Sequence, residues 1–176
     1  MLTRESIQFN GKEISLETGR LAKQANAAVL ATYGDTHVLV TVGLQESRED
    51  IDYFPLRIDY EERFYASGKI PGGFFKREGR PSDVAIISGR MIDRPIRPLF
   101  PDGYDDEVQI VATVFSAEPD CAPSILGILG ASAALLISEA PFAGPIAAVK
   151  IGRKDGQLVV NPDAVSQEEG GVEITV

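Results

Sequence analysis

The sequence contains no tryptophan, one cysteine, one histidine and two methionines among its 176 residues. Because a disulfide needs two cysteines, Cys121 cannot form one within the chain, which is typical of proteins from the reducing cytoplasm. His37 alone cannot supply a metal site built from several histidines of one chain. Residues 1–5 lack the apolar segment of a signal peptide. We therefore expect a cytoplasmic protein without an internal disulfide.

Long apolar runs are also scarce. Residues 121–138 form an uncharged stretch of 18 residues, which is the length of a short membrane-spanning helix. Small and polar residues such as Gly127, Gly130 and Ser132 make this stretch only weakly hydrophobic. Since 44% of the residues are hydrophobic, the chain can form a sizeable core. We expect this stretch to be a buried helix of a soluble fold, with no membrane segment.

Charge is distributed unevenly along the chain. The net charge is −9, from 17 basic and 26 acidic residues. Residues 63–97 hold eight cations and three anions, so this segment carries +5 and the remainder −14. An acidic body with one basic segment excludes a protein that coats nucleic acid over its whole surface, and it favours a localised anion site. The cations of the segment are Arg63, Lys69, Lys76, Arg77, Arg80, Arg90, Arg94 and Arg97.

The first half of the chain predicts mainly strands. Asn10-Gly11 lies between two short apolar runs, 7–9 and 14–16, and is typical of a hairpin turn. Valines at alternate positions in 36–42 indicate a half-buried strand. The other predicted strands are 27–33, 54–60, 108–115 and 171–176, together with a hairpin of 147–151 and 158–160.

Two helices are predicted. Ser82 is a good N-cap, and Asp83 favours the positive end of the helix dipole. Val84, Ile87 and Met91 follow at helical spacing, and Pro95 predicts that the helix ends near residue 93 or 94. The second helix is predicted over 123–139, where glycines and alanines allow close packing against a sheet.

Residues 61–81 are predicted to be irregular and too long for a plain connector, which is typical of a functional loop. Adjacent aromatic rings beside several cations are suited to single-stranded nucleic acid, because bases stack on rings and phosphates pair with cations. Instead of stacking on bases, at least one of the two rings could pack into the core. Instead of binding phosphates, the cations could simply belong to a solvated loop. The residues concerned are Phe74, Phe75, Lys76, Arg77 and Arg80.

Other charged residues leave further alternatives. Arg90, Arg94 and Arg97 either extend the basic surface or pair with acidic neighbours such as Asp93. No Gly-Lys-Ser/Thr sequence follows the glycines, which excludes a Walker-type phosphate loop. An acidic group near the predicted strand 54–60 indicates a solvated face rather than a metal site, and it comprises Asp50, Asp52, Asp59, Glu61 and Glu62.

The segment 57–100 resembles the first core domain of the bacterial polynucleotide phosphorylase family. The similarity lies in residues 57–70 (RIDYEERFYASGKI), 71–83 (PGGFFKREGRPSD) and 92–100 (IDRPIRPLF). Looser similarity covers essentially the whole chain. The resemblance implies an α+β fold, a ribonuclease-PH-like domain in which a mixed sheet packs against helices, with βαβ crossings of the less common left hand.

The resemblance also implies a domain organisation and an activity. Residues 1–176 would form the first ribonuclease-PH-like core domain, truncated at its C-terminal end. Members of the family form homotrimeric rings, shorten single-stranded RNA from its 3′ end with Mg²⁺ and inorganic phosphate, and act in RNA-degradation assemblies. In the family a phenylalanine-arginine loop holds the RNA at the channel constriction. By position this RNA-binding role falls on Phe74, Phe75, Lys76, Arg77 and Arg80.

The family's catalytic residues are expected to be missing from this chain. They lie in the second core domain and consist of two metal-binding aspartates and a lysine, whereas the matching positions here are Gln167, Glu173 and Thr175. Lys76 stands where the family often has arginine, so the charge is kept but the bidentate fork is lost. We therefore expect no catalytic residue and no metal site in this chain.

Two functions remain as hypotheses. The first is the RNA-guiding and ring-forming part of a phosphorolytic 3′-to-5′ exoribonuclease that releases nucleoside diphosphates. The alternative is a non-catalytic RNA-binding ring subunit of an exosome-like assembly. A stand-alone enzyme of the ribonuclease PH kind would need a metal-binding carboxylate pair and a complete domain, and the sequence shows neither.

Overall fold

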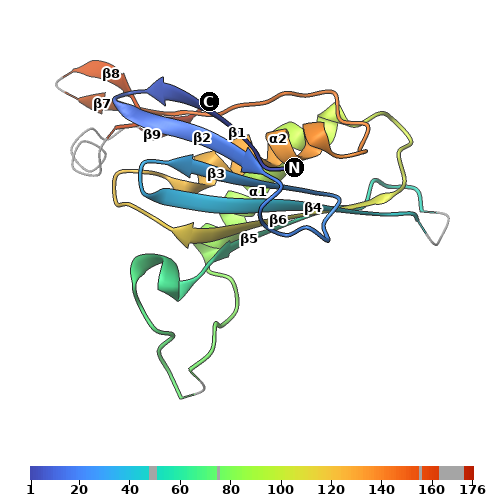
Figure 1. The fold of residues 1–176 in the computed structure, drawn as a ribbon, viewed down its shortest axis with the longest axis horizontal. Coiled ribbons are helices and arrows are strands. Elements are labelled where there is room, and N and C mark those ends of the chain that lie inside the picture. Colours follow the sequence, from blue (N-terminus) through green and yellow to red (C-terminus); the bar gives the residue numbers. More distant parts are fainter. Residues whose placement is uncertain (48–50, 75, 155, 163–172) are drawn as a thin grey trace.

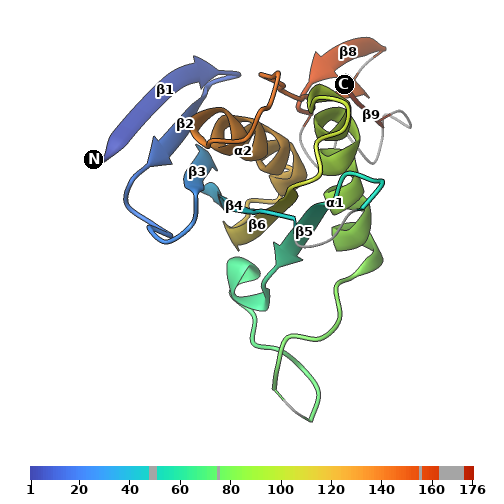
Figure 2. The same ribbon diagram turned by 90° about the vertical axis from the view of Figure 1, so that its right-hand side faces the viewer.

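The computed structural model describes residues 1–176 except 48–50, 75, 155 and 163–172. Its main feature is a six-stranded sheet with both helices packed on one face (Figures 1 and 2). The strands lie in the order β1-β2-β3-β4-β6-β5. Their bounds are β1 Thr3–Phe9, β2 Lys12–Thr18, β3 Ala27–Tyr33, β4 Thr36–Gln45, β5 Leu56–Glu62 and β6 Glu107–Ser116.

The first four strands form an antiparallel meander. Asn10 and Gly11 both adopt positive φ angles, 48° and 76°, which is the backbone that a tight hairpin turn requires. The predicted hairpin is therefore confirmed, with Ile7 opposite Ile14. The predicted strand 27–33 has the bounds of β3, while β4 continues three residues beyond its predicted end. Alternate residues of β3 and β4 are buried against the helices, as period-two patterning requires.

The sheet becomes mixed at β5 and β6, which are parallel. They are connected by helix α1 (Asp83–Ile96), which continues directly into a short 3₁₀ helix, η2 (Arg97–Leu99). Strand β5 starts and ends two residues later than predicted. Two helices on a mixed sheet confirm the predicted α+β class.

Helix α1 corrects two expectations. It ends at Ile96 rather than near residue 93 or 94, with Pro95 inside its last turn. Proline is tolerated there because only one backbone hydrogen bond is lost and the buried Ile96 anchors the turn. Val84 and Ile87 are exposed, whereas the packed face consists of Ala85, Ser88, Gly89, Ile92 and Ile96. Gly89 lies next to β5, where a Cβ would be 3.4 Å from the Ile58 carbonyl oxygen, in ordinary contact distance.

Helix α2 (Pro123–Ile137) is the predicted buried helix, two residues shorter than expected. It packs on β3 and β4, and Gly130 lies against Val40. Within the described ranges, no helix has both the length and the apolar character needed to cross a bilayer. The uncharged stretch 121–138 is thus accounted for by core packing.

A second, three-stranded sheet has the order β8-β7-β9. The predicted hairpin is formed by β7 (Lys150–Lys154), which starts and ends three residues later than predicted, and β8 (Gln157–Val160). Strand β9 (Glu173–Thr175) pairs with β7 and confirms the central part of the strand predicted at 171–176, of which residues 171 and 172 lie outside the described residues.

Candidate nucleic-acid interface

The segment 63–82, the basic loop, extends away from the end of β5 and from the body of the molecule (Figures 1 and 2). It begins with a single 3₁₀ turn, η1 (Phe64–Ser67), which Gly68 ends with a φ of 66°. The Glu78 carboxylate accepts a hydrogen bond from the backbone N–H of Phe64 at 3.0 Å. This contact joins residues 14 positions apart and holds the two ends of the loop together.

Phe74 lies at the far end of the basic loop and is 94% exposed. Gly73, with a φ of 74°, provides the turn that precedes it. The structure thus does not bury Phe74 in the core, which was one of the two alternatives. Phe75 lies outside the described residues.

The predicted cations follow immediately. Lys76, Arg77 and Arg80 are all exposed, and none has an ion-pair partner among the residues that the structure describes. Phe74 and these three cations are therefore presented to solvent together at this part of the basic loop. This is the combination that binds the bases and phosphates of a single strand.

At the base of the loop lies a pocket of about 350 Å³, between η1 and residues 78–82. Three carboxylates line it, and each already has a partner. Glu61 pairs with Arg63, and Glu78 accepts from Phe64. Glu62 hydrogen-bonds Tyr60, whose pKa is raised well above its ordinary value, chiefly because the phenol is buried.

Formal charges balance in this pocket, where Arg63, Lys69 and Arg80 face three carboxylates, but two of the cations have no ion-pair partner among the described residues. Lys69 and Arg80 both line it, and neither is paired within the described part of the chain. Lys69 was not among the predicted site residues. Two signals in the sequence could have identified it: its place among the eight cations of 63–97 and its position inside the segment 57–100 that carries the resemblance.

Helix α1 begins where the basic loop ends. The Ser82 hydroxyl accepts a hydrogen bond from the Ala85 N–H at 3.1 Å, so Ser82 is the predicted N-cap. One turn apart on the exposed surface of the helix, Arg90 and Arg94 have no ion-pair partner among the described residues. They are therefore available to extend the basic surface.

Arg97 has a structural role instead. Its guanidinium pairs with Asp93 at 2.6 Å and donates to the backbone carbonyls of Phe54 and Leu56 at 3.0 and 3.1 Å. It also lies over the Phe54 ring, 5.6 Å from the centroid. Arg97 is thus the one of the three arginines, with Arg90 and Arg94, that pairs with an acidic neighbour within the described residues rather than extending the basic surface. Its contacts connect the end of α1 to the start of β5.

Two members of the acidic group, Asp59 and Glu61, lie on β5, are partly exposed and pair with arginines. Asp59 pairs with Arg57 at 2.9 Å and accepts from the Gln109 amide at 3.0 Å. Across the residues that the structure describes, no three potential ligands gather in a way that could hold a metal ion. Asp50 and Gln167 lie outside those residues, while Glu173 and Thr175 belong to β9.

The comparisons with known proteins agree with this architecture. The family described as "3′ exoribonuclease family, domain 1" matches residues 10–141. The polyribonucleotide nucleotidyltransferase of Heliobacterium modesticaldum is 56% identical over 172 residues, which are 97% of this chain and 24% of the relative. The protein of the same name from Desulforamulus reducens is 57% identical over 176 residues, 100% of this chain and 24% of the relative. The chain thus spans about a quarter of the length of these curated relatives.

The crystal structure of rice Rrp46 is similar in fold, with a TM-score of 0.67 over 98% of this chain and 79% of that one. At 12% identity this likeness concerns the fold alone. The family match covers most of the chain, including β2 to β6, the basic loop, α1 and α2. The chain therefore belongs to the 3′ exoribonuclease family and carries its domain 1.

Proposed function

We propose that this chain is the RNA-guiding and ring-forming part of a 3′-to-5′ phosphorolytic exoribonuclease that releases nucleoside diphosphates. The family and the names of the curated relatives support this proposal. The observation that carries the RNA-guiding role is the basic loop, where the exposed ring of Phe74 is followed by three exposed cations without ion-pair partners in the described chain.

Each group has a distinct task in this proposal. A base stacks on Phe74, and Phe75 supplies a second ring next to it. Arg77 and Arg80 bind phosphates with bidentate guanidinium groups, whereas Lys76 acts as a point charge. Stacking and phosphate contacts do not depend on base identity, so the strand is held without sequence preference and can slide as it shortens.

The exposed arginines of α1 provide a continuation of this path. Arg90 and Arg94 lie on the helix that starts three residues after Arg80. Their charges would bind phosphates beyond the basic loop. In a homotrimeric ring, three basic loops would surround one channel, and the strand would contact several copies at once.

The bond-breaking step belongs to another part of the protein. In the parent enzyme, phosphate would attack the terminal phosphodiester, and a divalent metal ion held by another domain would supply charge stabilisation. The matching positions of this chain offer one carboxylate, Glu173, beside Gln167 and Thr175, and this donor set does not fit a site that needs two aspartates. The chain's own contribution is to bind and orient the RNA, in a cytoplasmic enzyme that associates with an RNA-degradation assembly.

The alternative, a non-catalytic ring subunit of an exosome-like assembly, has less support. The curated relatives carry the name of a nucleotidyltransferase, and the chain matches them over nearly its whole length. The solved structure that is similar in fold shares only 12% of its residues with this chain. The enzyme is therefore the function that we favour.

The proposal is tested by titrating fluorescein-labelled oligo(A) with this chain and with Phe74→Ala. Loss of one base stack is expected to weaken binding by about 1–3 kcal/mol. Tyr53→Ala is the matched control, because Tyr53 is 65% exposed and precedes β5 at the end opposite the basic loop. Equal affinities for the wild type and Phe74→Ala would contradict the guiding role.

A second assay examines the proposed lack of a catalytic centre. The chain is incubated with poly(A), inorganic phosphate and Mg²⁺, and ADP is measured. We expect no ADP, although oligo(A) is bound. ADP above the level of a mock purification would show that an active centre lies within these residues and would refute this part of the proposal.

A further inference from the structure

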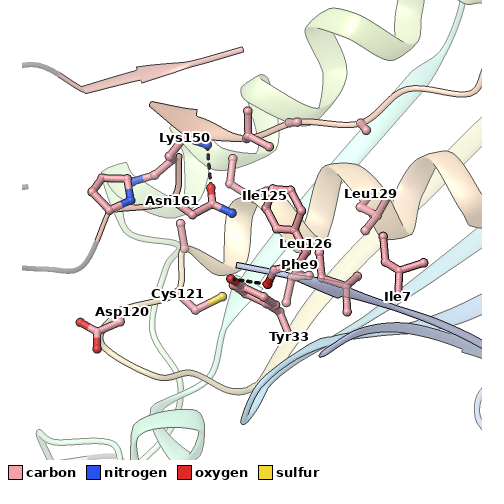
Figure 3. Close-up of a pocket in the computed structure, with 16 residues that line it drawn as sticks. Ile7, Phe9, Tyr33, Asp120, Cys121, Ile125, Leu126, Leu129, Lys150 and Asn161 are labelled. Carbon is pink, nitrogen blue, oxygen red and sulfur yellow. Dashed lines mark hydrogen bonds between the residues drawn. The ribbon is translucent and has the colours of Figure 1, made fainter. Parts of the chain in front are cut away.

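A cavity of about 200 Å³, the hairpin cavity, lies beneath the N-terminal hairpin (Figure 3). Strands β1 and β2 form one wall with Ile7, Phe9 and Ile14, and α2 forms another with Ile125 and Leu129. Residues 147–150 and 161–162 close it on a third side. The cavity is separate from the basic loop, which leaves the sheet at the end of β5, whereas the hairpin forms the opposite edge (Figure 1).

Hydrogen bonds at the rim keep these walls apart. The Asn10 side chain at the hairpin tip donates to the Val160 carbonyl at 2.8 Å. Asn161 and Lys150 bond each other twice, through the Asn161 side-chain oxygen at 2.9 Å and its backbone N–H at 2.7 Å. Lys12 at the start of β2 pairs with Glu118, which precedes α2. The hairpin therefore cannot move down onto α2 without breaking the contacts of Asn10 and Lys12.

The lining is apolar, with few polar groups. Tyr33 donates its hydroxyl to the Phe9 carbonyl at 3.4 Å. The side-chain oxygen of Asn161 accepts from Lys150, whereas its amide nitrogen has no hydrogen-bond partner among the described residues and is turned toward Ile125 and Phe9 (Figure 3). A buried water needs two to four polar partners, which such walls do not provide. The cavity thus suits an apolar occupant with one hydrogen-bond acceptor.

We propose that the hairpin cavity binds a small, mostly apolar molecule that carries one carbonyl or similar acceptor, which the Asn161 amide nitrogen holds. The volume of the cavity determines how large this molecule can be. An engineered apolar cavity of about 150 Å³ binds benzene, so about 200 Å³ accommodates a substituted benzene ring. Apolar walls with a few converging polar groups are the usual composition of a small-molecule site.

Occupation of the cavity has two measurable consequences. A ligand that contacts both the hairpin and α2 binds only the folded chain, so it raises the melting temperature in proportion to its concentration and affinity. The only cysteine of the sequence, Cys121, forms part of the wall and is 8% exposed. A bound molecule therefore slows the reaction of this thiol with a thiol reagent.

The experiment uses two probes of nine non-hydrogen atoms each, acetophenone with a carbonyl and cumene without one. Thermal unfolding and the rate of Cys121 modification by 4,4′-dithiodipyridine are followed as each probe is titrated. We expect saturable stabilisation and protection of the thiol by both probes, with acetophenone binding about tenfold more tightly. No shift and no protection at millimolar probe would overturn the proposal.

Two variants separate the roles of volume and polarity. Asn161→Asp keeps the oxygen that accepts from Lys150, tolerates the φ of 48° and removes the donor. We expect it to abolish the tenfold preference for acetophenone over cumene. Leu129→Trp fills the cavity and should prevent binding of both probes, whereas Leu136→Ala, at an exposed position of α2, should leave both unchanged. Binding of cumene by Leu129→Trp with wild-type affinity would refute the assignment of the site.

RNA binding provides a check on independence. Acetophenone should leave the affinity for oligo(A) unchanged, because the basic loop contributes nothing to the cavity. Loss of probe binding in Phe74→Ala would contradict the proposed location. Since the cavity assay needs no RNA, its failure is distinguishable from failure of the proposed function.

Discussion

Gly130→Ala is expected to destabilise the fold although alanine is the better helix former. A Cβ at this position of α2 would lie 2.7 Å from Cγ2 of Val40 and 3.5 Å from the Cβ of Ala31. Val40 and Ala31 are both 0% exposed and belong to central strands, so neither can move aside easily. Overpacking of this kind costs about 1–3 kcal/mol, against a gain in helix propensity of about 1 kcal/mol.

Gly127→Ala is the matched control, because it changes the same helix by the same methyl group. Its Cβ would lie 3.1 Å from Cδ1 of Ile92, the far end of a flexible side chain that can shift. The propensity gain is common to both variants, so the difference between them isolates the contact with β4. We expect Gly130→Ala to be less stable than Gly127→Ala by about 1–3 kcal/mol.

The assay is urea unfolding followed by circular dichroism, with the free energy of unfolding extrapolated to water. The double variant Gly130→Ala/Val40→Ala removes Cγ2 of Val40, so the penalty of the Gly130 substitution should largely disappear in that background. Equal stabilities of Gly130→Ala and Gly127→Ala would refute the close packing of α2 on β4.

Two further predictions concern stability. Glu118→Gln tests the ion pair with Lys12, whose hydrogen bond lowers the pKa of the Glu118 carboxyl. Because the pKa is lower in the folded state, the pair stabilises the fold at neutral pH, and this contribution is lost as the pH falls through the lowered pKa. The variant should therefore be less stable than the wild type at pH 7 and equally stable in acid, and a difference that persists in acid would contradict this. Ser82→Ala removes the side-chain acceptor for the Ala85 N–H and should cost about 1 kcal/mol in urea unfolding; Ser82→Asp, which keeps an acceptor, is the control, and no loss in the alanine variant would refute the cap.

The elements that depend on local sequence were predicted well. Asn10-Gly11 determines its turn through backbone preference alone, and the alternating valines in 36–42 are sufficient to identify a half-buried strand. Ser82 was identified as an N-cap because the residues that follow it are helical in both composition and spacing. These features require no knowledge of what the segment packs against.

The register of α1 could not be predicted from the same kind of pattern. Val84, Ile87 and Met91 form an apolar row, yet the packed face contains Ser88 and Gly89. The helix packs closely on β5, where small residues fit, and this proximity is a property of the tertiary structure. From Pro95 the helix was predicted to end two or three residues too early. The buried Ile96 keeps the last turn helical through contacts with core residues that are distant in the sequence.

The candidate site was predicted in part. Phe74 and the cations were identified from their composition, and the structure leaves them exposed. The hydrogen bond from Phe64 to Glu78, which closes the base of the loop, could not be predicted because neither residue has a distinctive signal. The sequence also could not show that Arg97 pairs while Arg90 and Arg94 stay unpaired within the described chain, because the carbonyls that Arg97 contacts belong to a distant segment.

The most direct test of the guiding role is the salt dependence of oligo(A) binding by the wild type and by Lys76→Ala/Arg77→Ala/Arg80→Ala. Each phosphate contact with a single strand contributes about 0.7 to the slope of log affinity against log salt. Loss of three contacts should reduce the slope by about 2, so between 50 and 200 mM salt the wild type should lose about 18-fold more affinity than the variant. Lys23→Ala, an exposed cation that precedes β3, is the control. An unaltered slope in the triple variant would contradict direct contact between the basic loop and RNA.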